Sequence, residues 1–167
     1  MFAFARNVVT AMSLVFALSP ATMHAQSQDP STYMHVHAPF AQDLVTKVKT
    51  AHDAELVKLG LHAVPPGETD NVIIANITPS KVGKKSSAAD MQKLAAGKPV
   101  AVRLEKDKTF DLLIPITDAK GRDLSGGFVV MEVPFTKAAT EEEAIRIGVA
   151  VRDDMQRQIP SAKALYK

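Results

Sequence analysis

The sequence contains no cysteine. Disulfides, thiolate metal sites, haem attachment through thioethers and cysteine nucleophiles are therefore all excluded. The chain also has little net charge, because 20 Lys and Arg residues face 18 Asp and Glu residues, which gives a formal charge of +2. So small a balance implies neither nucleic acid nor an anionic membrane as a partner.

Long hydrophobic runs are also scarce, and the one that stands out lies at the N-terminus. Arg6 precedes an apolar run over residues 8–18, and small residues follow it up to Ala21 or Ala25. The run is shorter than the roughly twenty residues that cross a bilayer as a helix. This pattern predicts a cleavable signal peptide over residues 1–25, with cleavage after Ala25 or Ala21. The mature chain would then be periplasmic or secreted, with no membrane span.

The length of 167 residues fits one folded domain with a sizeable core. Residues 26–38 are polar and predict a flexible leader. Residues 39–160 carry all the periodic patterns and form the expected domain, and residues 161–167 are expected to be a C-terminal tail. No internal repeat or low-complexity segment is present.

The most informative stretch is residues 98–135, which predicts three consecutive antiparallel strands. Apolar and polar side chains alternate over residues 100–105 and again over residues 110–116, which is the period of a half-buried strand. Residues 106–108 are expected to form a three-residue hairpin loop, and residues 118–121 a second turn. The third strand is expected over residues 124–135.

These turns predict a register for the meander. A three-residue loop places Arg103 directly opposite Asp111. The second turn pairs Leu113 with Gly126 and Asp111 with Phe128.

The predicted register gives the sheet two unlike faces. One face is wholly apolar and is expected to pack on helices; it carries Phe110, Leu112, Ile114, Val129, Met131 and Val133. The other face is mixed, with a gap at a glycine; it carries Arg103, Glu105, Asp111, Gly126, Phe128 and Glu132. A sheet of this kind buries its apolar face and can use the other as the floor of a pocket.

Helices are expected on both sides of this stretch. A long helix of about twenty residues begins at Pro39 and ends at Gly60, and a short strand covers residues 72–78. A short helix begins at an N-cap, Ser86 or Ser87, and runs to Ala96.

The last helix begins after Thr140. The first turn of this helix carries three glutamates, whose negative charge opposes the helix dipole. Its buried stripe is expected at every third or fourth residue, and Pro160 ends it. The stripe comprises Ala144, Gly148, Val151, Met155 and Ile159. The predicted class is therefore α+β.

In this order of elements the chain resembles the Cache domains, which are extracytoplasmic PAS-like sensor modules, and in particular the stand-alone single-module type. The resemblance rests on VIIANITPSKVGKKSSAADMQKLAAGKPV and FDLLIPITDAKGRDLSGGFVVMEVPF. It implies a PAS/Cache-like antiparallel sheet with a long N-terminal helix, a short roofing helix and a C-terminal helix. It also implies a sensor that binds a small organic acid, amino acid or amine. Cache modules usually precede a second membrane helix, which is not predicted here, so either a membrane-bound partner carries the signal or the module only binds its ligand.

The candidate ligand-binding residues lie on the mixed face and around the short helix. Arg103 is either a guanidinium clamp for a carboxylate, with Asp111 orienting it or receiving an amine, or half of an exposed ion pair. Gly126 would leave room above Phe128. The remaining two candidates are Asn76, which is either a ligand contact or a satisfied buried amide, and Lys84, which is either an anion contact or a solvated charge.

Metal and cofactor chemistry has little support. His35 and His37 are two residues apart in the leader and make an incomplete site, so no metal ligand set and no cofactor are predicted. His52 lies on the apolar stripe of the first helix, where a hydrogen-bonded core histidine is the ordinary interpretation.

Catalysis is not predicted. Ser125 precedes two glycines but lacks the strand-turn-helix context of a nucleophile elbow, and no histidine or acid is assigned to it. The sequence thus favours a non-catalytic binding domain. Two alternatives stay open: a structural or interaction protein whose pocket is filled, and a metal-handling protein that uses His35 and His37.

Overall fold

The computed structural model describes residues 32–167, and it forms one five-stranded antiparallel sheet with three α-helices. The α+β class is confirmed. The order of strands across the sheet is β2-β1-β5-β4-β3. In chain order the elements are α1 (Pro39–Ala51), β1 (Lys58–Ala63), β2 (Val72–Asn76), η1 (Pro79–Lys81), α2 (Ala88–Leu94), β3 (Val100–Leu104), β4 (Thr109–Thr117), β5 (Asp123–Pro134), α3 (Glu141–Arg157) and η2 (Ala162–Tyr166).

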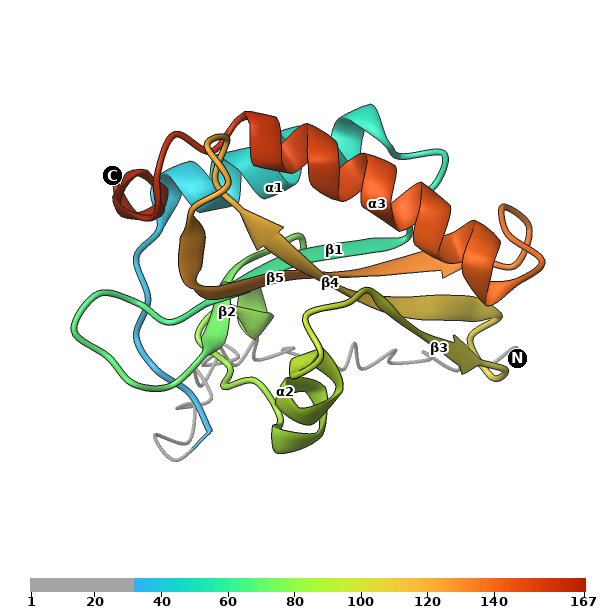
Figure 1. The fold of residues 1–167 in the computed structure, drawn as a ribbon, viewed down its shortest axis with the longest axis horizontal. Helices are drawn as coiled ribbons and strands as arrows, with labels where there is room; N and C mark the ends of the chain where they lie inside the picture. The colour runs from blue at the N-terminus through green and yellow to red at the C-terminus, as the bar shows by residue number, and fades with distance from the viewer. Residues whose placement is uncertain (1–31) are drawn as a thin grey trace, which may run out of the picture.

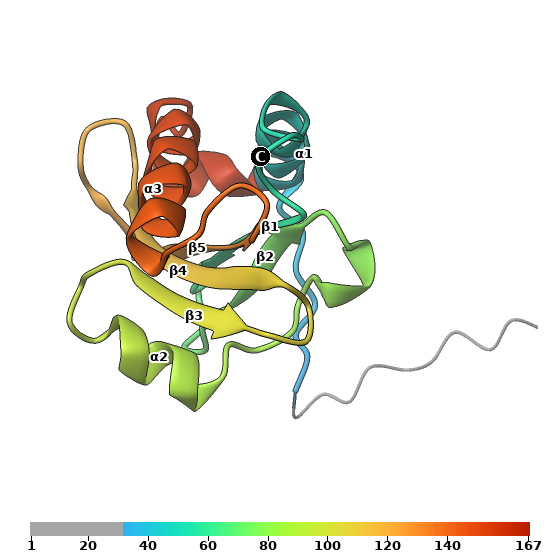
Figure 2. The ribbon, with the colours of Figure 1, turned by 90° about the vertical axis from the view of Figure 1, so that its right-hand side faces the viewer.

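The molecule has three layers. Helices α1 and α3 lie side by side on one face of the sheet, and the short helix α2 lies alone against the opposite face (Figures 1 and 2). The core fills the space between the sheet and the two long helices. As predicted, the buried side of the meander carries Phe110, Leu112, Ile114, Val129, Met131 and Val133.

Helix α1 is shorter than the sequence pattern predicts. It has 13 residues and ends at Ala51, and the backbone N–H of the C-cap residue His52 bonds to the Val48 carbonyl oxygen at 3.0 Å. The expected helix of about twenty residues is therefore wrong. Leu59 is buried instead in strand β1, which the sequence reading missed. Apolar residues spaced by three and four fit both a helix and a turn followed by a strand, so the period alone did not separate the two.

Strand β1 lies in the middle of the sheet, between β2 and β5. Gly60, expected to end the first helix, lies within this strand opposite Asn76. A Cβ atom at Gly60 would come within 2.5 Å of the Asn76 side-chain nitrogen. The glycine is therefore required by the close approach of a neighbouring side chain rather than by a helix end.

The hairpin between β3 and β4 differs from the predicted register by one residue. Arg103 pairs with Phe110, and Val102 pairs with Asp111. The loop has one more residue than expected, because Glu105 belongs to the turn and not to β3, and Lys108 ends this turn in a left-handed conformation with φ of 55°. A slip of one residue moves every side chain of β3 to the other face, so the predicted pairing of Arg103 with Asp111 is wrong.

The pairing of β4 with β5 is displaced by four residues from the prediction. Asp111 pairs with Glu132, Leu113 with Val130, and Pro115 with Phe128. Three residues of this displacement arise because residues 124–127 bulge out of the ladder between the pairs Pro115–Phe128 and Thr117–Asp123. The fourth arises because the turn before β5 is one residue longer than predicted. Since an even displacement keeps the side-chain parity, the two faces of these strands are nevertheless as predicted.

Helix α3 follows the sequence prediction closely. The Thr140 side chain accepts a hydrogen bond from the Glu143 backbone N–H, and the buried stripe comprises Ala144, Gly148, Val151 and Met155. Helix α2 begins with the predicted cap as well, because the Ser87 hydroxyl accepts from the Asp90 backbone N–H.

Two further segments bear on the predicted boundaries. Residues 162–166, expected to belong to a tail, form η2, and Leu165 within it is completely buried. The predicted signal peptide over residues 1–25 lies outside the described residues. No helix in the described part of the chain is long and apolar enough to cross a membrane.

Candidate functional site

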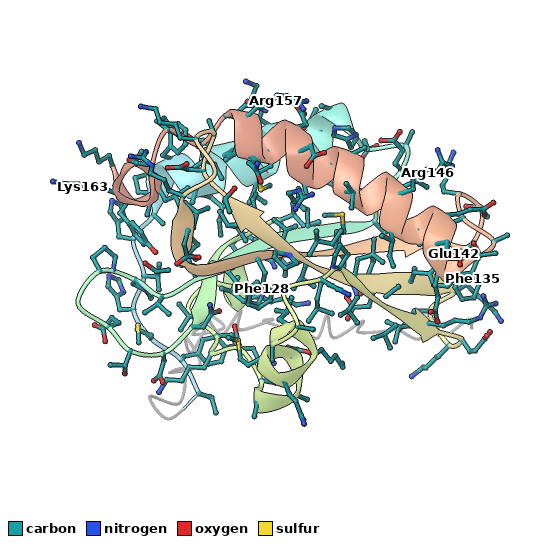
Figure 3. The ribbon with its side chains drawn as sticks, viewed as in Figure 1. Phe128, Phe135, Glu142, Arg146, Arg157 and Lys163 are labelled. Atoms are coloured by element: carbon teal, nitrogen blue, oxygen red, sulfur yellow. The ribbon has the colours of Figure 1, made fainter. Side chains whose placement is uncertain are left out.

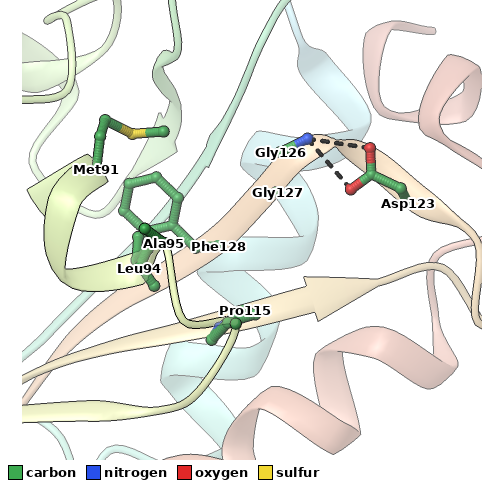
Figure 4. Close-up of a pocket in the computed structure, with 9 residues that line it drawn as sticks. Met91, Leu94, Ala95, Pro115, Asp123, Gly126, Gly127 and Phe128 are labelled. Atoms are coloured by element: carbon green, nitrogen blue, oxygen red, sulfur yellow. Dashed lines mark hydrogen bonds between the residues drawn. The ribbon is translucent and has the colours of Figure 1, made fainter.

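The short helix α2 covers a cavity on the face of the sheet that the long helices leave free. None of its own residues is fully buried, and Met91 is 38% exposed. Beneath the helix lies a cavity of about 240 Å³. It is lined by Met91, Leu94, Ala95, Gly97, Pro115, Asp123, Gly126, Gly127 and Phe128 (Figure 4). We call it the α2 cavity.

The floor of the α2 cavity is formed by neighbouring positions of β4 and β5. Pro115 and Phe128 are paired across the two strands, and the Phe128 ring lies between the sheet and α2 (Figures 3 and 4). The walls are mostly apolar, and Asp123 is the one ionisable residue among those that line the cavity in the described structure. The cavity therefore suits an apolar group better than an anion.

The bulge in β5 shapes one end of the cavity. Ser125 and Gly126 both have a positive φ, 61° and 69°. Both carboxylate oxygens of Asp123 accept a hydrogen bond from the Gly126 backbone N–H at 3.2 Å (Figure 4). The Ser125 carbonyl oxygen accepts from the Val64 N–H at 3.0 Å. Bulges with positive φ recur beside binding sites because they turn the backbone out of the ladder.

Gly126 keeps the space above the bulge open. Within 4 Å, a Cβ atom at this position would meet only the Asn71 side-chain nitrogen, at 3.6 Å. No large side chain covers the glycine in the described residues. This observation argues against the alternative in which the pocket is filled with side chains.

A buried hydrogen-bond network lies next to the floor of the α2 cavity. Asn71 donates to the Gly126 carbonyl oxygen at 2.9 Å and accepts from the Ser86 hydroxyl at 2.7 Å. Since the hydroxyl has only one proton, His62 must donate from Nδ1 to the Ser86 oxygen, which lies at 2.8 Å. The His62 ring stacks on Phe128 with centroids 4.3 Å apart. The network thus connects the loop before β2, the start of α2 and the aromatic floor.

Burial keeps the His62 imidazole neutral. Its exposed fraction is 6%, and burial lowers its pKa to about 4, opposed only by the distant Asp90 carboxylate. The hydrogen-bond network then places the proton of the neutral ring on Nδ1. His62 lies in β1, a strand that the sequence pattern did not predict, so this role was not identified from the sequence.

Two carboxyl groups lie side by side near the α2 cavity, on the same face. Asp111 and Glu132 pair across β4 and β5. Burial, and then the Glu132 carboxylate, raise the pKa of Asp111 to about 6. Glu132 accepts hydrogen bonds from Lys58 Nζ at 2.5 Å and from the Thr109 hydroxyl at 3.4 Å. Among the described residues, Asp111 is thus the carboxyl group of this pair that no cation contacts.

A second, more polar cavity of about 320 Å³ adjoins the first. Met91 lines both cavities, and Asn71 and Ser86 of the network line the second one. Its charged lining residues, Lys85 and Asp70, form an ion pair at 2.8 Å.

The structure separates the candidate residues that the sequence grouped together. Phe128 and Gly126 line the α2 cavity, and Asp111 lies on the same face but outside the cavity lining. Arg103 lies on the opposite face, at the edge of the sheet, where its guanidinium carbon is 4.1 Å from the centre of the Phe135 ring and its Nε bonds to Glu105. Arg103 and Asp111 are therefore not brought together, and the predicted clamp has no geometry to support it.

The other two candidates are in neither of the cavities under α2. The Asn76 side chain accepts from the Thr78 backbone N–H at 2.8 Å, which is local turn chemistry at the end of β2. Lys84 is exposed, and its backbone forms an isolated bridge with Tyr33.

The two histidines considered as metal ligands lie in the described part of the chain. His35 and His37 are both exposed, and the described residues contain no group of three His, Cys, Asp or Glu side chains that could hold a metal ion. His52 connects the two long helices instead: its ring nitrogens lie 2.6 Å from Glu55 Oε2 and 3.4 Å from Asp154 Oδ2.

The sequence reading missed most of the α2 cavity, including Met91, Leu94, Ala95, Pro115 and Asp123. A usable signal was the i, i+3 pair Met91 and Leu94 on a helix too short to bury a full stripe. Two apolar side chains on such a helix indicate a lid over another surface rather than a core element.

No protein-family model matches the chain, and no curated protein matches it. Among solved structures, the repressor BlcR of Agobacterium tumefaciens is similar at 9% identity, with a TM-score of 0.42, over 70% of this chain and 67% of that one. The C-terminal domain of the Escherichia coli transcriptional regulator KdgR is similar at 12% identity, with a TM-score of 0.45, over 77% of this chain and 98% of that one.

These similar structures correct the family expected from the sequence. They are a repressor and a domain of a transcriptional regulator, not Cache sensor domains. The expected assignment of the chain to the Cache domains is therefore wrong. At these identities the similarity describes the course of the backbone and transfers no ligand or activity.

Proposed function

We propose that this protein is a non-catalytic domain that binds a small molecule in the α2 cavity. The observation that carries the proposal is an open, mostly apolar cavity between a loosely packed helix and the floor of Pro115 and Phe128. Cavities of this kind, apolar with a few polar groups, are the usual form of small-molecule sites.

The lining of the cavity selects among the ligand classes considered from the sequence. Asp123 is the ionisable residue of the lining, and the Phe128 ring offers an aromatic face. The Asp123 carboxylate would repel a carboxylate ligand and attract a protonated amine. The ammonium group of such a ligand could also lie over the Phe128 ring. The proposed ligand is therefore a small amine with an apolar group, and not an organic acid.

A titration of the purified protein with three matched probes tests this function. Benzylamine is expected to bind and raise the melting temperature, benzyl alcohol to bind more weakly, and benzoate not to bind. At a concentration a hundred times its dissociation constant, a ligand stabilises the folded state by about 2.7 kcal/mol. Calorimetric titration and thermal unfolding measure the two effects.

Variants locate the binding. Ala95→Phe fills the α2 cavity and is expected to abolish benzylamine binding, whereas Ala89→Phe, at an exposed α2 position outside the cavity lining, is expected to preserve it. Arg103→Ala is expected to leave affinity unchanged and to cost less than about 1 kcal/mol of stability. If none of the three probes binds, or if binding survives in Ala95→Phe, the proposed function is wrong.

Export is a separate proposal, which rests on the pattern of residues 1–25. The mature chain is expected to begin at Gln26 or Thr22 when the full gene product is made in its native host. Intact-mass spectrometry measures the N-terminus. Protein that retains residues 1–25 would contradict the predicted cleavage.

A further inference from the structure

The largest of the cavities described here lies away from α2, at the end of the molecule where η2 packs. Its volume is about 480 Å³. It is lined by Val64, Pro66, Leu124, Ser125, Ala162, Lys163, Tyr166 and Lys167. Figure 1 shows η2 and the loop between β1 and β2 at the same end of the fold. We call it the η2 cavity.

The β5 bulge separates the η2 cavity from the α2 cavity. Leu124 and Ser125 line the former, whereas Gly126, Gly127 and Phe128 line the latter. No residue lines both. The two cavities are therefore distinct, and the η2 cavity can be tested without reference to the α2 cavity.

One polar group beside the η2 cavity lacks a partner. Among the described residues, the Tyr166 hydroxyl is the buried side-chain polar atom that has no hydrogen-bond partner. Buried hydroxyls are nearly always satisfied, so an exception of this kind needs an explanation such as a water or a ligand. Burial raises the pKa of Tyr166 to about 12, so the hydroxyl keeps its proton and is available as a donor.

The charged side chains that line the η2 cavity have one sign. Lys163 and Lys167 are both exposed lining residues, and no acidic side chain is among the lining residues of the described chain. Figure 3 shows Lys163 on the outer side of this end of the molecule. The rest of the lining is mainly apolar, with Val64, Pro66 and Leu124 on one side.

We propose that the η2 cavity is a second binding site, which takes a small amphipathic carboxylate. The apolar body of the ligand fills the cavity. Its carboxylate accepts a hydrogen bond from the Tyr166 hydroxyl and lies within reach of the Lys163 ammonium group, and a charge-assisted hydrogen bond of this kind is among the stronger polar contacts.

Calorimetric titration with decanoate tests the site, with decyltrimethylammonium as the cationic control of similar length. Decanoate is expected to bind and the cation is not. Tyr166→Phe is expected to weaken decanoate about ten- to a hundredfold, the loss typical of one hydrogen bond to a charged group. Its melting temperature is expected to be unchanged or higher, because the hydroxyl has no partner in the free protein.

The role of charge is tested with a further pair of variants, and the location of the site with a third variant. Lys163→Gln is expected to weaken decanoate, whereas Lys81→Gln, at an exposed position outside the η2 cavity, is not. Ala95→Phe in the α2 cavity is expected to leave decanoate binding intact, so failure of one site does not imply failure of the other. Equal binding of both surfactants, or wild-type affinity in both Tyr166→Phe and Lys163→Gln, would overturn the proposal.

Discussion

Leu112→Ala is expected to lower the free energy of unfolding by about 2 to 5 kcal/mol, the usual cost of truncating a completely buried leucine. Leu112 is 0% exposed and lies in the centre of β4. Its side chain packs against α3 at Gly148, where a Cβ atom would come within 2.5 Å of Leu112 Cδ1. The variant therefore opens a cavity at a close contact between the sheet and this helix.

The same contact predicts a compensating pair. Gly148→Ala alone is expected to cost about 1 to 3 kcal/mol by overpacking against Leu112 and Ile114. In the Leu112→Ala background the added methyl group enters vacated space, so the second change is expected to cost less or to stabilise. Urea denaturation of the two single variants and the double variant gives the coupling free energy, expected at about 0.5 to 3 kcal/mol.

Leu94→Ala is the matched control, because Leu94 is half-buried on α2 and lies outside the core. It is expected to cost clearly less than Leu112→Ala. Strict additivity of the two core changes would show that Gly148 does not make room for Leu112, and that the packing of α3 on the sheet differs from the one described.

The second large effect is the pH dependence of stability, in which Asp111 and His62 act in opposite directions. Asp111 has a folded-state pKa of about 6, raised from 3.8, so the folded state holds its proton more tightly and its contribution falls as pH rises between these values. His62 has a folded-state pKa of about 4, lowered from 6.5, so its contribution is lost as pH falls from 6.5 to 4. In the wild type the two trends largely cancel.

Replacing one of the two residues is expected to make the pH dependence that the other contributes to stability visible. In Asp111→Asn, stability should rise by about 3 kcal/mol between pH 4 and pH 6.5, since each pKa unit corresponds to about 1.4 kcal/mol. In His62→Gln, stability should instead fall over this range. Urea denaturation at pH 4, 5 and 6.5 measures both slopes relative to the wild type.

Asp107→Asn, in the exposed β3–β4 turn, is the control for the loss of a carboxylate. Its stability is expected to vary with pH as that of the wild type does. The groups that act on Asp111 are Glu132, Asp90, Lys93 and Lys58, and all of them are retained in these variants. Parallel pH profiles for the wild type and Asp111→Asn would show that Asp111 titrates in the folded state as it does in the unfolded chain.

The sequence by itself determined the features that depend on a few neighbouring residues. Thr140 and Ser87 cap their helices as predicted, because a cap is a hydrogen bond over three residues. The buried faces of β4 and β5 follow from strict alternation, which survives any even displacement of the register. The buried stripe of α3 was predictable for the same reason, because the helical period places residues three or four apart on one face of the helix.

Only the tertiary structure decided which residues meet. One additional loop residue, Glu105, moved Arg103 to the face opposite Asp111. The β5 bulge depends on partners distant in sequence, Val64 and Asn71, which bond to its carbonyl groups. Likewise, Leu59 became part of a strand because β5 and β2 provide backbone partners on both sides of β1. The cavities follow from these long-range pairings, which no local pattern of residues encodes.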